Sequence, residues 1–251
     1  MTPLTKDEIV KMRAAGKLAA RTLEHAAKFI KAGISTDEID KIVHDFTLSA
    51  GATPAPLGYH GFPKAVCTSV NSVICHGVPD NTILKEGDII NVDVTPILDG
   101  FYGDTSATFF VGEVSDKAKD IVDCAEKAMW KGIEEVRAGA TTGDIGFAIN
   151  KLVTKRGYHV VREIGGHGIG KVFHDDPFVP SYGKKGRGPK LLPWCCITVE
   201  PMINETDAEI DEISIPNSEI KYYHTGDRTL SAQFEHTVLI TDVGYEIMTL
   251  P

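Results

Sequence analysis

The sequence lacks the features that mark disulfide-rich, membrane-spanning and nucleic-acid-binding proteins. Its five cysteines form no Cys-x-x-Cys pair, and their odd number argues against a disulfide framework. No apolar run approaches membrane-spanning length, and Lys6, Asp7 and Glu8 leave no apolar signal-peptide core near the start. Positive charge is scarce, since 26 basic residues face 35 acidic ones and the net charge is −9. Duplex nucleic acid and membranes are therefore disfavoured as partners, and we expect a soluble protein of the cytoplasm.

Three common catalytic motifs are also missing. The sequence contains no Gly-x-Ser-x-Gly nucleophile elbow and no His-Glu-x-x-His helix. The glycines of residues 165–170 follow a Gly-x-x-Gly-x-Gly spacing with no new helix after them, so they do not form a dinucleotide fingerprint. These glycines instead let the backbone approach its neighbours closely and aim His167 at another group.

The chain has the length and composition of one large globular domain. With 251 residues, of which 42% are hydrophobic and 24% charged, it can bury a sizeable core. No Pro- or Ser-rich linker divides it, so we expect a single domain over residues 1–251. Capping boxes and apolar periodicity predict helices over residues 5–33, 35–51, 115–137 and 142–155. Strands are predicted near 65–73 and 89–111 and over most of 158–248, with a loop at 178–193.

An internal repeat indicates that this domain consists of two related halves. The segment Ala32–Ile39 resembles Ala138–Ile145 at an offset of 106 residues, and Gly51 matches Gly157 at the same offset. In both places an amphipathic helix ends at Ala-Gly and a hydroxyl-rich cap opens another helix. Few positions are identical, so chance similarity remains the alternative. The repeat predicts halves of roughly 1–113 and 114–251, related by a pseudo-twofold axis.

Two aspartates of the first half are predicted to lie side by side. Residues 89–95 alternate between apolar and polar, as in a half-buried strand, and Asp99-Gly100 supplies a turn. Asp93 and Asp104 lie at mirrored distances from a point just before that turn, which makes them near cross-strand partners. Like charges directly opposite each other repel, and burying two anions without compensation costs several kcal/mol. A cation between them resolves the conflict; the alternative is one exposed aspartate and one turn aspartate.

The second half supplies two more acids and a histidine. Glu200 and Glu235 each lie in an apolar, strand-like segment with no basic residue nearby in sequence. An ion pair with a distant arginine, and a purely structural role for His167, are the alternatives. Together with Asp93 and Asp104, these residues can hold two divalent ions. An oxygen-rich site with one imidazole suits manganese, iron(II), cobalt or zinc better than copper. Two such ions about 3.5–4 Å apart activate a water and polarise a carbonyl, which suits the hydrolysis of an amide.

The candidate residues lie in a characteristic set of motifs spread over almost the whole chain. These motifs are Leu57–Pro63 (LGYHGFP), Val73–Pro79 (VICHGVP), Asn91–Val94 (NVDV), Tyr102–Ser106 (YGDTS), Gly166–Gly170 (GHGIG), Val199–Met202 (VEPM) and Ser231–Thr237 (SAQFEHT). In this order they resemble the methionine aminopeptidases, in particular the short bacterial type I form. The resemblance implies the α+β pita-bread fold shared with aminopeptidase P, prolidase and creatinase, with a central antiparallel sheet covered by helices. It implies removal of the initiator methionine from peptides and nascent chains, at the ribosome and preferentially before a small second residue.

The resemblance also implies a role for each candidate residue. Asp93 would chelate one metal ion, His167 and Glu200 would hold the other, and Asp104 and Glu235 would bridge them. His76 would contact the scissile amide or the nucleophile, His174 would hydrogen-bond the substrate carbonyl, and Glu200 would shuttle a proton. The methionine side chain would occupy a pocket walled by Tyr59, Phe62, Cys67 and Phe173, since aromatic rings and a thiol suit a thioether.

Three segments depart from the pattern of this family, and three other readings remain open. Residues 193–196 stand where relatives usually have a Gly-Met pair, residues 221–223 where they often place a tryptophan, and residues 205–220 are longer and more acidic than usual. These departures bear on the rim of the pocket and on second-residue preference. The alternatives are an Xaa-Pro peptidase of the same fold, a non-catalytic peptide-binding relative, and a calcium-binding domain, which imidazole ligation disfavours.

Overall fold

The computed structural model describes residues 2–251, which form four α-helices, one short 3-10 helix and seventeen strands. The helices are α1 (Lys6–Ala27), α2 (Thr36–Ser49), α3 (Asp116–Ile133), α4 (Thr142–Lys155) and the 3-10 helix η1 (Tyr59–Gly61). The strands of the first half are β1 (Thr53–Pro54), β2 (Cys67–Val70), β3 (Val73–Cys75), β4 (Ile89–Val94), β5 (Pro96–Leu98), β6 (Phe101–Tyr102) and β7 (Thr105–Phe110). Those of the second half are β8 (His159–Val160), β9 (Gly166–Ile169), β10 (Asp175–Val179), β11 (Cys196–Val199), β12 (Met202–Asn204), β13 (Ile210–Ser214), β14 (Lys221–Thr225), β15 (Ser231–Gln233), β16 (Glu235–Ile240) and β17 (Tyr245–Ile247).

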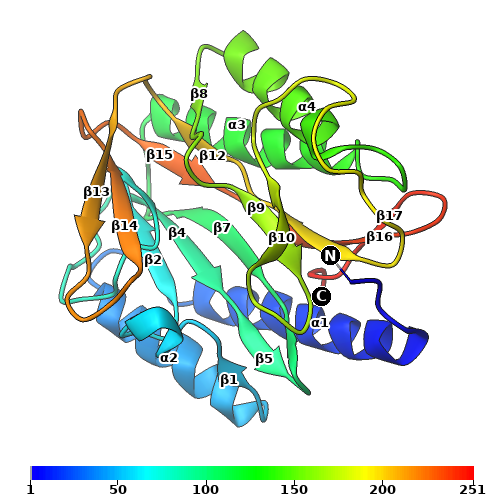
Figure 1. The fold of residues 1–251 in the computed structure, drawn as a ribbon. Helices are drawn as coiled ribbons and strands as arrows, with labels where there is room; N and C mark the ends of the chain where they lie inside the picture. The colour runs from blue at the N-terminus through cyan, green and yellow to red at the C-terminus, as the bar shows by residue number, and fades with distance from the viewer. Residues whose placement is uncertain (1) are drawn as a thin grey trace.

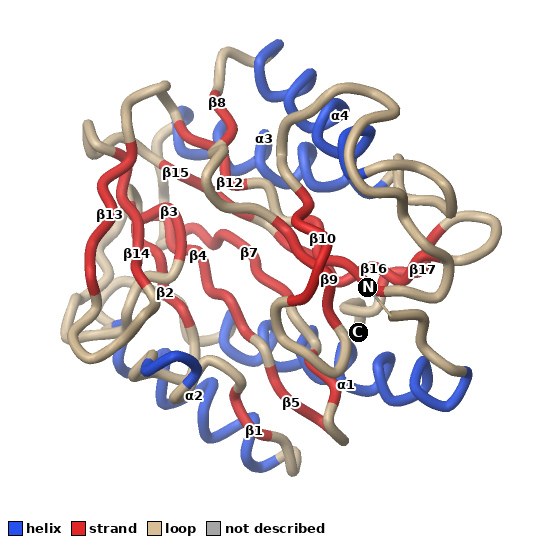
Figure 2. Tube along the Cα trace, in the orientation of Figure 1, coloured by secondary structure: helices blue, strands red, loops and turns tan. Residues whose placement is uncertain are grey.

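A central eight-stranded sheet organises the molecule. Its strands run in the order β10-β9-β11-β16-β7-β4-β2, and β17 pairs with β16. Every pairing within it is antiparallel. Helices α1 and α2 lie along the half of the sheet that holds β4 and β7, and α3 and α4 lie along the half that holds β11 and β16 (Figures 1 and 2). This arrangement confirms the predicted α+β architecture.

The two halves of the sheet correspond element by element. The central pair β7–β16 is flanked by β4 on one side and β11 on the other, and then by β2 and β9. Helices α2 and α4 are both 14 residues long and begin 106 residues apart, as the repeat predicts. An isolated bridge joins Ser35 to Ile83 in the first half and Thr141 to Lys190 in the second. The pseudo-twofold relation is therefore present in the fold.

Local sequence signals account for most of the helix boundaries. Ser35 opens α2 with a reciprocal capping box in which Glu38 is the partner, and the chain leaves the helix toward Gly51 at φ 74°. Helix α1 is shorter than predicted, because it ends at Ala27 and not near Gly33. The amide of Gly33 donates to the Leu84 carbonyl at 2.8 Å, so the residues after α1 contact the segment that precedes β4.

Helix α3 also ends before its predicted boundary, at Ile133 and not at Arg137. Beyond that point the amides of Glu135 and Val136 donate to carbonyls three residues back, at 3.1 and 2.9 Å. This tighter pattern is the usual way in which the last turn of a helix unwinds.

The helices pack on the sheet through continuous apolar faces. In the first half Ile39 and Val43 of α2 join Ile90 and Val92 of β4 in one buried cluster. A larger cluster in the second half includes Ile121, Met129 and Ile133 of α3 with Ile197 and Val199 of β11. These clusters hold both halves of the sheet firmly on the side away from the candidate site.

A close backbone contact fixes the segment that carries Asp104. A Cβ atom added at Gly103 would lie 2.3 Å from the Ala15 carbonyl oxygen of α1, so only glycine fits. Gly103 also donates to the Pro96 carbonyl at 3.1 Å. The sequence position directly before Asp104 is therefore held between α1 and the sheet.

A smaller hairpin covers one end of the central sheet. Strand β13 pairs with β14, and β14 pairs with β3. This hairpin contains most of the long acidic segment 205–220. The connection between β13 and β14 contacts η1. The amide of Glu219 donates to the His60 carbonyl at 2.9 Å, and Nδ1 of the His60 imidazole lies 2.7 Å from the Glu219 carboxylate. None of the helices in residues 2–251 is long and apolar enough to cross a membrane.

Candidate active site

The register of the sheet gathers acids from both halves on one face. Asp93 of β4 lies opposite Ser106 of β7, and Ser106 also lies opposite Glu235 of β16. Directly opposite residues on adjacent strands point to the same face. Asp104 precedes Ser106 by two residues and shares this face. Asp93, Asp104 and Glu235 therefore converge across three neighbouring strands.

The hairpin turns at Asp99-Gly100, as predicted, and Asp93 and Asp104 are near but not direct cross-strand partners. Asp93 pairs with Ser106 and not with Asp104, because the hairpin axis passes between Asp99 and Gly100, one residue later than the mirror relation assumes. Asp104 is consequently a diagonal neighbour of Asp93 on the same face. Its carboxylate accepts a hydrogen bond at 2.8 Å from the Thr95 hydroxyl. The shift leaves the convergence of the two acids intact.

Glu200 and His167 complete the cluster from the second half. Glu200 directly follows β11, whose pairing with β16 ends at Val199 opposite His236, next to Glu235. The Thr198 hydroxyl donates to one carboxylate oxygen of Glu200 at 2.8 Å, and the Gln233 side-chain amide donates to the other at 3.2 Å. Glu200 is thus held by neutral donors, and no arginine is among its hydrogen-bond partners within residues 2–251.

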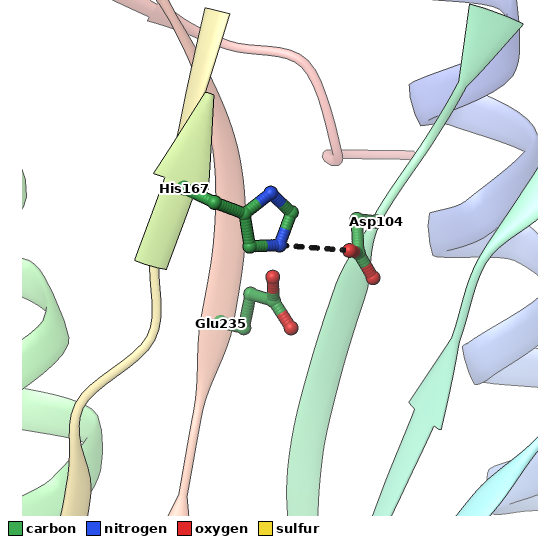
Figure 3. A group of neighbouring side chains, drawn as sticks. All are labelled: Asp104, His167 and Glu235. Carbon is green, nitrogen blue, oxygen red and sulfur yellow. Dashed lines mark ion pairs between the residues drawn. The ribbon is translucent and has the colours of Figure 1, made fainter. Parts of the chain in front are cut away.

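The His167 imidazole is oriented toward the acids by its own backbone surroundings. The His167 amide donates to Thr198 Oγ1 at 2.9 Å, and Nδ1 lies 3.0 Å from the Gly168 carbonyl oxygen. Because a carbonyl only accepts, Nδ1 carries the proton and Nε2 presents a lone pair. Nε2 lies 3.5 Å from Glu200 and 3.7 Å from Asp104. Figure 3 shows His167, Asp104 and Glu235 pointing toward one another.

The electrostatics of the cluster are those of uncompensated buried anions. Burial raises the pKa of Asp104 to about 7, and burial together with the negative charge of Asp104 raises the pKa of Glu200 to about 8. For Asp93 and Glu235, burial and repulsion by the other acids raise the pKa well above its usual range. Burial lowers the pKa of His167 to about 4. The cluster therefore disfavours both anions and a protonated imidazole unless a cation is supplied from outside.

The donor set fits divalent metal ions. Ligand atoms of Asp104, His167 and Glu235 all lie within 4.8 Å of one another. Oδ1 of Asp93 and Oε1 of Glu235 are buried and have no hydrogen-bond partner among the described residues. Buried polar atoms are normally satisfied, so these two oxygens indicate a missing partner. Carboxylate oxygens with one neutral imidazole are ligands for manganese, iron(II), cobalt or zinc.

A cavity of about 150 Å³ opens beside the cluster. Its lining contains all eleven residues proposed from the sequence, namely Tyr59, Phe62, Cys67, His76, Asp93, Asp104, His167, Phe173, His174, Glu200 and Glu235. The same lining includes Pro56, Thr95, Ile164, Gly165 and Ile220 and, within residues 2–251, neither lysine nor arginine. The cavity thus has a polar floor of acids and an apolar side.

The apolar side is built from aromatic contacts between the halves. The rings of Tyr59 and Phe173 have centroids 5.0 Å apart, and Phe173 stacks on His174 at 4.1 Å. Phe62 and Cys67 belong to one buried cluster with Ile215 from the connection between β13 and β14. A flexible apolar side chain would find continuous contact here.

Two further histidines face the cavity and make distinct contacts. Nδ1 of His76 lies 3.0 Å from the Lys221 carbonyl oxygen, and Nδ1 of His174 lies 2.9 Å from the Tyr59 hydroxyl. Burial lowers the pKa of His76, and burial together with His167 lowers that of His174 to about 3. Both imidazoles are therefore neutral at neutral pH.

The segments that depart from the family pattern have different relations to the cavity. Trp194, in the first of them, lies outside the lining and donates its amide to the Ile240 carbonyl at 2.7 Å. Ile220 lines the cavity, and the Lys221 carbonyl contacts His76. The β13–β14 hairpin, and not residues 193–196, therefore shapes the rim.

Three residues that support the cluster were not predicted from the sequence. Thr95, Thr198 and Gln233 hold Asp104 and Glu200 in place by the hydrogen bonds described above. Alternation along β11 was a usable signal, since Thr198 and Glu200 must face the same side of a strand.

Comparison with known proteins gives the class of this fold and site. The model of metallopeptidase family M24 matches residues 10–242, and the chain belongs to this family. It is 48% identical to a methionine aminopeptidase of Rickettsia prowazekii, over 98% of this chain and 94% of that one, and 44% identical to one of Escherichia coli, over 98% and 92%. These relatives place it with the bacterial methionine aminopeptidases, which confirms the resemblance seen in the sequence and the expectation of a metal-dependent aminopeptidase.

Solved structures show the same relationship in three dimensions. A crystal structure of methionine aminopeptidase from Rickettsia prowazekii superposes with a TM-score of 0.96 at 48% identity and covers all of both chains. An Xaa-Pro dipeptidase from Bacillus anthracis has a TM-score of 0.77 at 25% identity and covers 99% of this chain but 62% of its own. The pita-bread fold, common to methionine aminopeptidases and prolidases, is therefore confirmed.

Proposed function

We propose that this chain removes the N-terminal methionine from peptides with two divalent metal ions, and that it prefers substrates with a small second residue. One observation carries the proposal: four carboxylates and one imidazole from both halves, all able to bind metal, line one cavity whose side is apolar. The close relatives named methionine aminopeptidase support the same conclusion. We further propose that residues 1–251 act as a single catalytic domain in which each half supplies part of the site.

The positions of the ligands support a division of labour between two metal ions. Asp93 would chelate one ion, and His167 and Glu200, whose ligand atoms lie 3.5 Å apart, would hold the other. Asp104 and Glu235 would bridge them, since Asp104 directly precedes β7 and Glu235 begins β16, the two strands at the centre of the sheet. When bound, such a pair of ions supplies a strong nucleophile from water and polarises the attacked carbonyl.

The remaining cavity residues would bind and orient the peptide. Tyr59, Phe62, Cys67 and Phe173 would enclose the methionine side chain. His76 and His174 would contact the scissile amide from the rim of the metal cluster. Glu200, whose carboxylate is oriented by Thr198 and Gln233, would carry the proton toward the leaving nitrogen.

A peptide-release assay tests the proposal directly. The chain is stripped with a chelator, reloaded separately with manganese, cobalt, iron(II) or zinc, and offered Met-Ala-Ser, Met-Trp-Ser and an Xaa-Pro peptide. We expect metal-dependent release of methionine, faster from Met-Ala-Ser than from Met-Trp-Ser. Preferential cleavage of the Xaa-Pro peptide would instead support the activity of the more distant structural relative.

A matched pair of variants tests whether activity depends on the proposed metal ligand Asp104 or on the hairpin in general. Asp104→Asn removes a proposed bridging ligand, whereas Asp99→Asn changes an exposed aspartate on the turn of the same hairpin. Asp99 has φ 50°, a conformation that asparagine also adopts readily. We expect Asp104→Asn to lose activity and Asp99→Asn to keep it. Equal activity in both variants would contradict the proposed role of Asp104.

We also propose that the enzyme acts in the cytoplasm on nascent chains at the ribosome. The support is indirect: the substrate of the proposed reaction is the N-terminus of a newly made protein, and the acidic chain offers no strongly basic composition for binding nucleic acid by itself. Cosedimentation with translating ribosomes that carry a methionyl nascent chain, compared with empty ribosomes, would test this.

A further inference from the structure

His76 and His174, the cavity histidines outside the proposed ligand set, differ in the chemical nature of their Nδ1 partner. His76 faces a backbone carbonyl, that of Lys221, at 3.0 Å, whereas His174 faces a phenolic hydroxyl, that of Tyr59, at 2.9 Å. A neutral imidazole carries one proton, on Nδ1 or on Nε2, and the partner of one nitrogen fixes the state of the other. The two partners therefore determine what each histidine presents to the cavity.

For His76 the outcome follows from the carbonyl alone. A carbonyl oxygen can only accept, so Nδ1 of His76 must donate to Lys221. The neutral ring then presents an unprotonated Nε2, which is a hydrogen-bond acceptor. His76 itself sits in a left-handed conformation at φ 55°, so its ring direction is set by the backbone as well as by this hydrogen bond.

For His174 the hydroxyl of Tyr59 favours the opposite outcome. The Tyr59 hydroxyl has no other hydrogen-bond partner in the described part of the chain, and it can donate its proton to an imidazole lone pair. Burial raises the pKa of Tyr59, so the hydroxyl keeps its proton at neutral pH. Accepting at Nδ1 leaves the proton of His174 on Nε2, which is then a donor.

We propose that Tyr59 is a positioning residue for the reaction: its hydroxyl holds His174 in the Nε2–H tautomer while the Lys221 carbonyl holds His76 in the Nδ1–H tautomer, so that the rim presents one donor and one acceptor. The inference rests on the proposed function for its substrate. A peptide bond offers one C=O acceptor and one N–H donor. His174 matches the carbonyl and His76 matches the amide N–H.

The tautomers can be measured in the metal-free chain without any substrate. Nitrogen-15 NMR of labelled histidine distinguishes a protonated from an unprotonated ring nitrogen, and His76→Ala and His174→Ala spectra assign the two signals among the nine histidines. We expect opposite tautomers in the wild type. Tyr59→Phe should move His174 toward a mixture of tautomers and leave His76 unchanged. Identical tautomers in the wild type, or an unchanged His174 signal in the variant, would overturn the proposal.

Kinetics with methionyl peptide test whether the hydroxyl acts through His174. Tyr59→Phe keeps the aromatic wall and removes one neutral hydrogen bond, so kcat should fall by about three- to tenfold with little change in KM. The matched control is Tyr102→Phe. Tyr102 stacks near Phe173 at 5.4 Å, lies outside the cavity lining and makes no described side-chain hydrogen bond. Removing the Tyr102 hydroxyl should leave kcat unchanged.

A double-mutant cycle gives the decisive comparison. If Tyr59 acts only by holding His174, Tyr59→Phe should have no further effect on kcat in a His174→Ala background. A full additional loss in that background would show that the hydroxyl acts independently and would overturn the proposal. If the wild type released no methionine at all, the proposed function would fail, whereas the NMR measurement would still decide the tautomer assignment.

Discussion

Raising the pH is expected to destabilise the metal-free protein, because four buried acids then have to ionise beside one another. Each of these carboxyl groups has a folded-state pKa above its ordinary value. Between the ordinary and the raised pKa, the folded chain keeps protons that the unfolded chain has released. Stability is then greatest at low pH and falls as the pH rises toward the folded pKa.

The magnitude follows from the number of protons that the folded state retains. Each retained proton lowers the free energy of unfolding by about 1.4 kcal/mol per pH unit. Glu200, with a pKa raised to about 8, keeps most of its proton between about pH 7 and about pH 8. One such proton over about one pH unit gives a loss of about 1 kcal/mol. The raised pKa values of Asp93 and Glu235 act in the same direction. Asp104, with a pKa raised from 3.8 to about 7, adds to this loss mainly in the lower part of the range.

The pH range is chosen so that the histidines do not interfere. Burial lowers the pKa of His167 to about 4 and that of His236 to about 4. A histidine with a lowered folded pKa contributes stability that is lost as the pH falls below its unfolded value of about 6.5. Below that value the two effects oppose each other. From about pH 7 upward the histidines are largely neutral in both states, and the carboxyl groups determine the slope.

Urea unfolding of chelator-treated protein across this range, repeated with saturating manganese, measures the effect. Without metal, stability should fall as the pH rises. With metal, the trend should weaken or reverse, because metal ions bind deprotonated ligands and stabilise only the folded chain. Asp104→Asn removes one charge from the cluster, so it should flatten the metal-free slope and reduce the gain from manganese, while Asp99→Asn should behave as the wild type. A metal-free stability independent of pH over this range would refute the electrostatic reasoning.

Three further predictions address the site and its support. Asp104→Asn and Glu235→Gln should each abolish turnover and lose at least one metal ion; near-normal activity with two ions bound, by metal analysis beside kinetics, would contradict the ligand assignment. His174→Ala should keep its metal and fold but lose about 10²–10³ in kcat, as expected for loss of a donor to developing charge; a change in KM alone would contradict that role. Gly103→Ala should destabilise the fold by about 1–3 kcal/mol, because its Cβ would meet the Ala15 carbonyl oxygen at 2.3 Å; unchanged urea unfolding would show that α1 moves freely.

Features encoded by neighbouring residues were predictable from the sequence. The reciprocal cap of Ser35 and Glu38 defines the start of α2, and the match between Gly51 and Gly157 indicates where two equivalent helices end. The repeat of 106 residues also matches the spacing between the starts of α2 and α4. These signals act over three to four residues or recur in the chain, so no knowledge of tertiary contacts is needed to detect them.

Features that depend on distant contacts were not predictable. The segment that follows α1 is held by the hydrogen bond from Gly33 to Leu84, and the side chain of Glu200 is oriented partly by Gln233, 33 residues away. The contact between Tyr59 and His174 spans 115 residues. No local pattern marks the hydroxyl of a pocket tyrosine as a hydrogen-bond donor to a particular ring nitrogen.

The arrangement of the site across β7 and β16 has a consequence for the order of folding. Asp93 and Asp104 belong to one half, and Glu200, Glu235 and His167 to the other, so neither half holds the complete set of proposed ligands. Asp104 and Glu235 are separated by 131 residues, and closing so long a chain segment must precede their meeting. Tight metal binding can therefore arise only after the halves have docked. The metal ions would bind late in folding and stabilise the assembled sheet, and they would not direct the folding of either half alone. Metal uptake during refolding would therefore report the docking of the two halves.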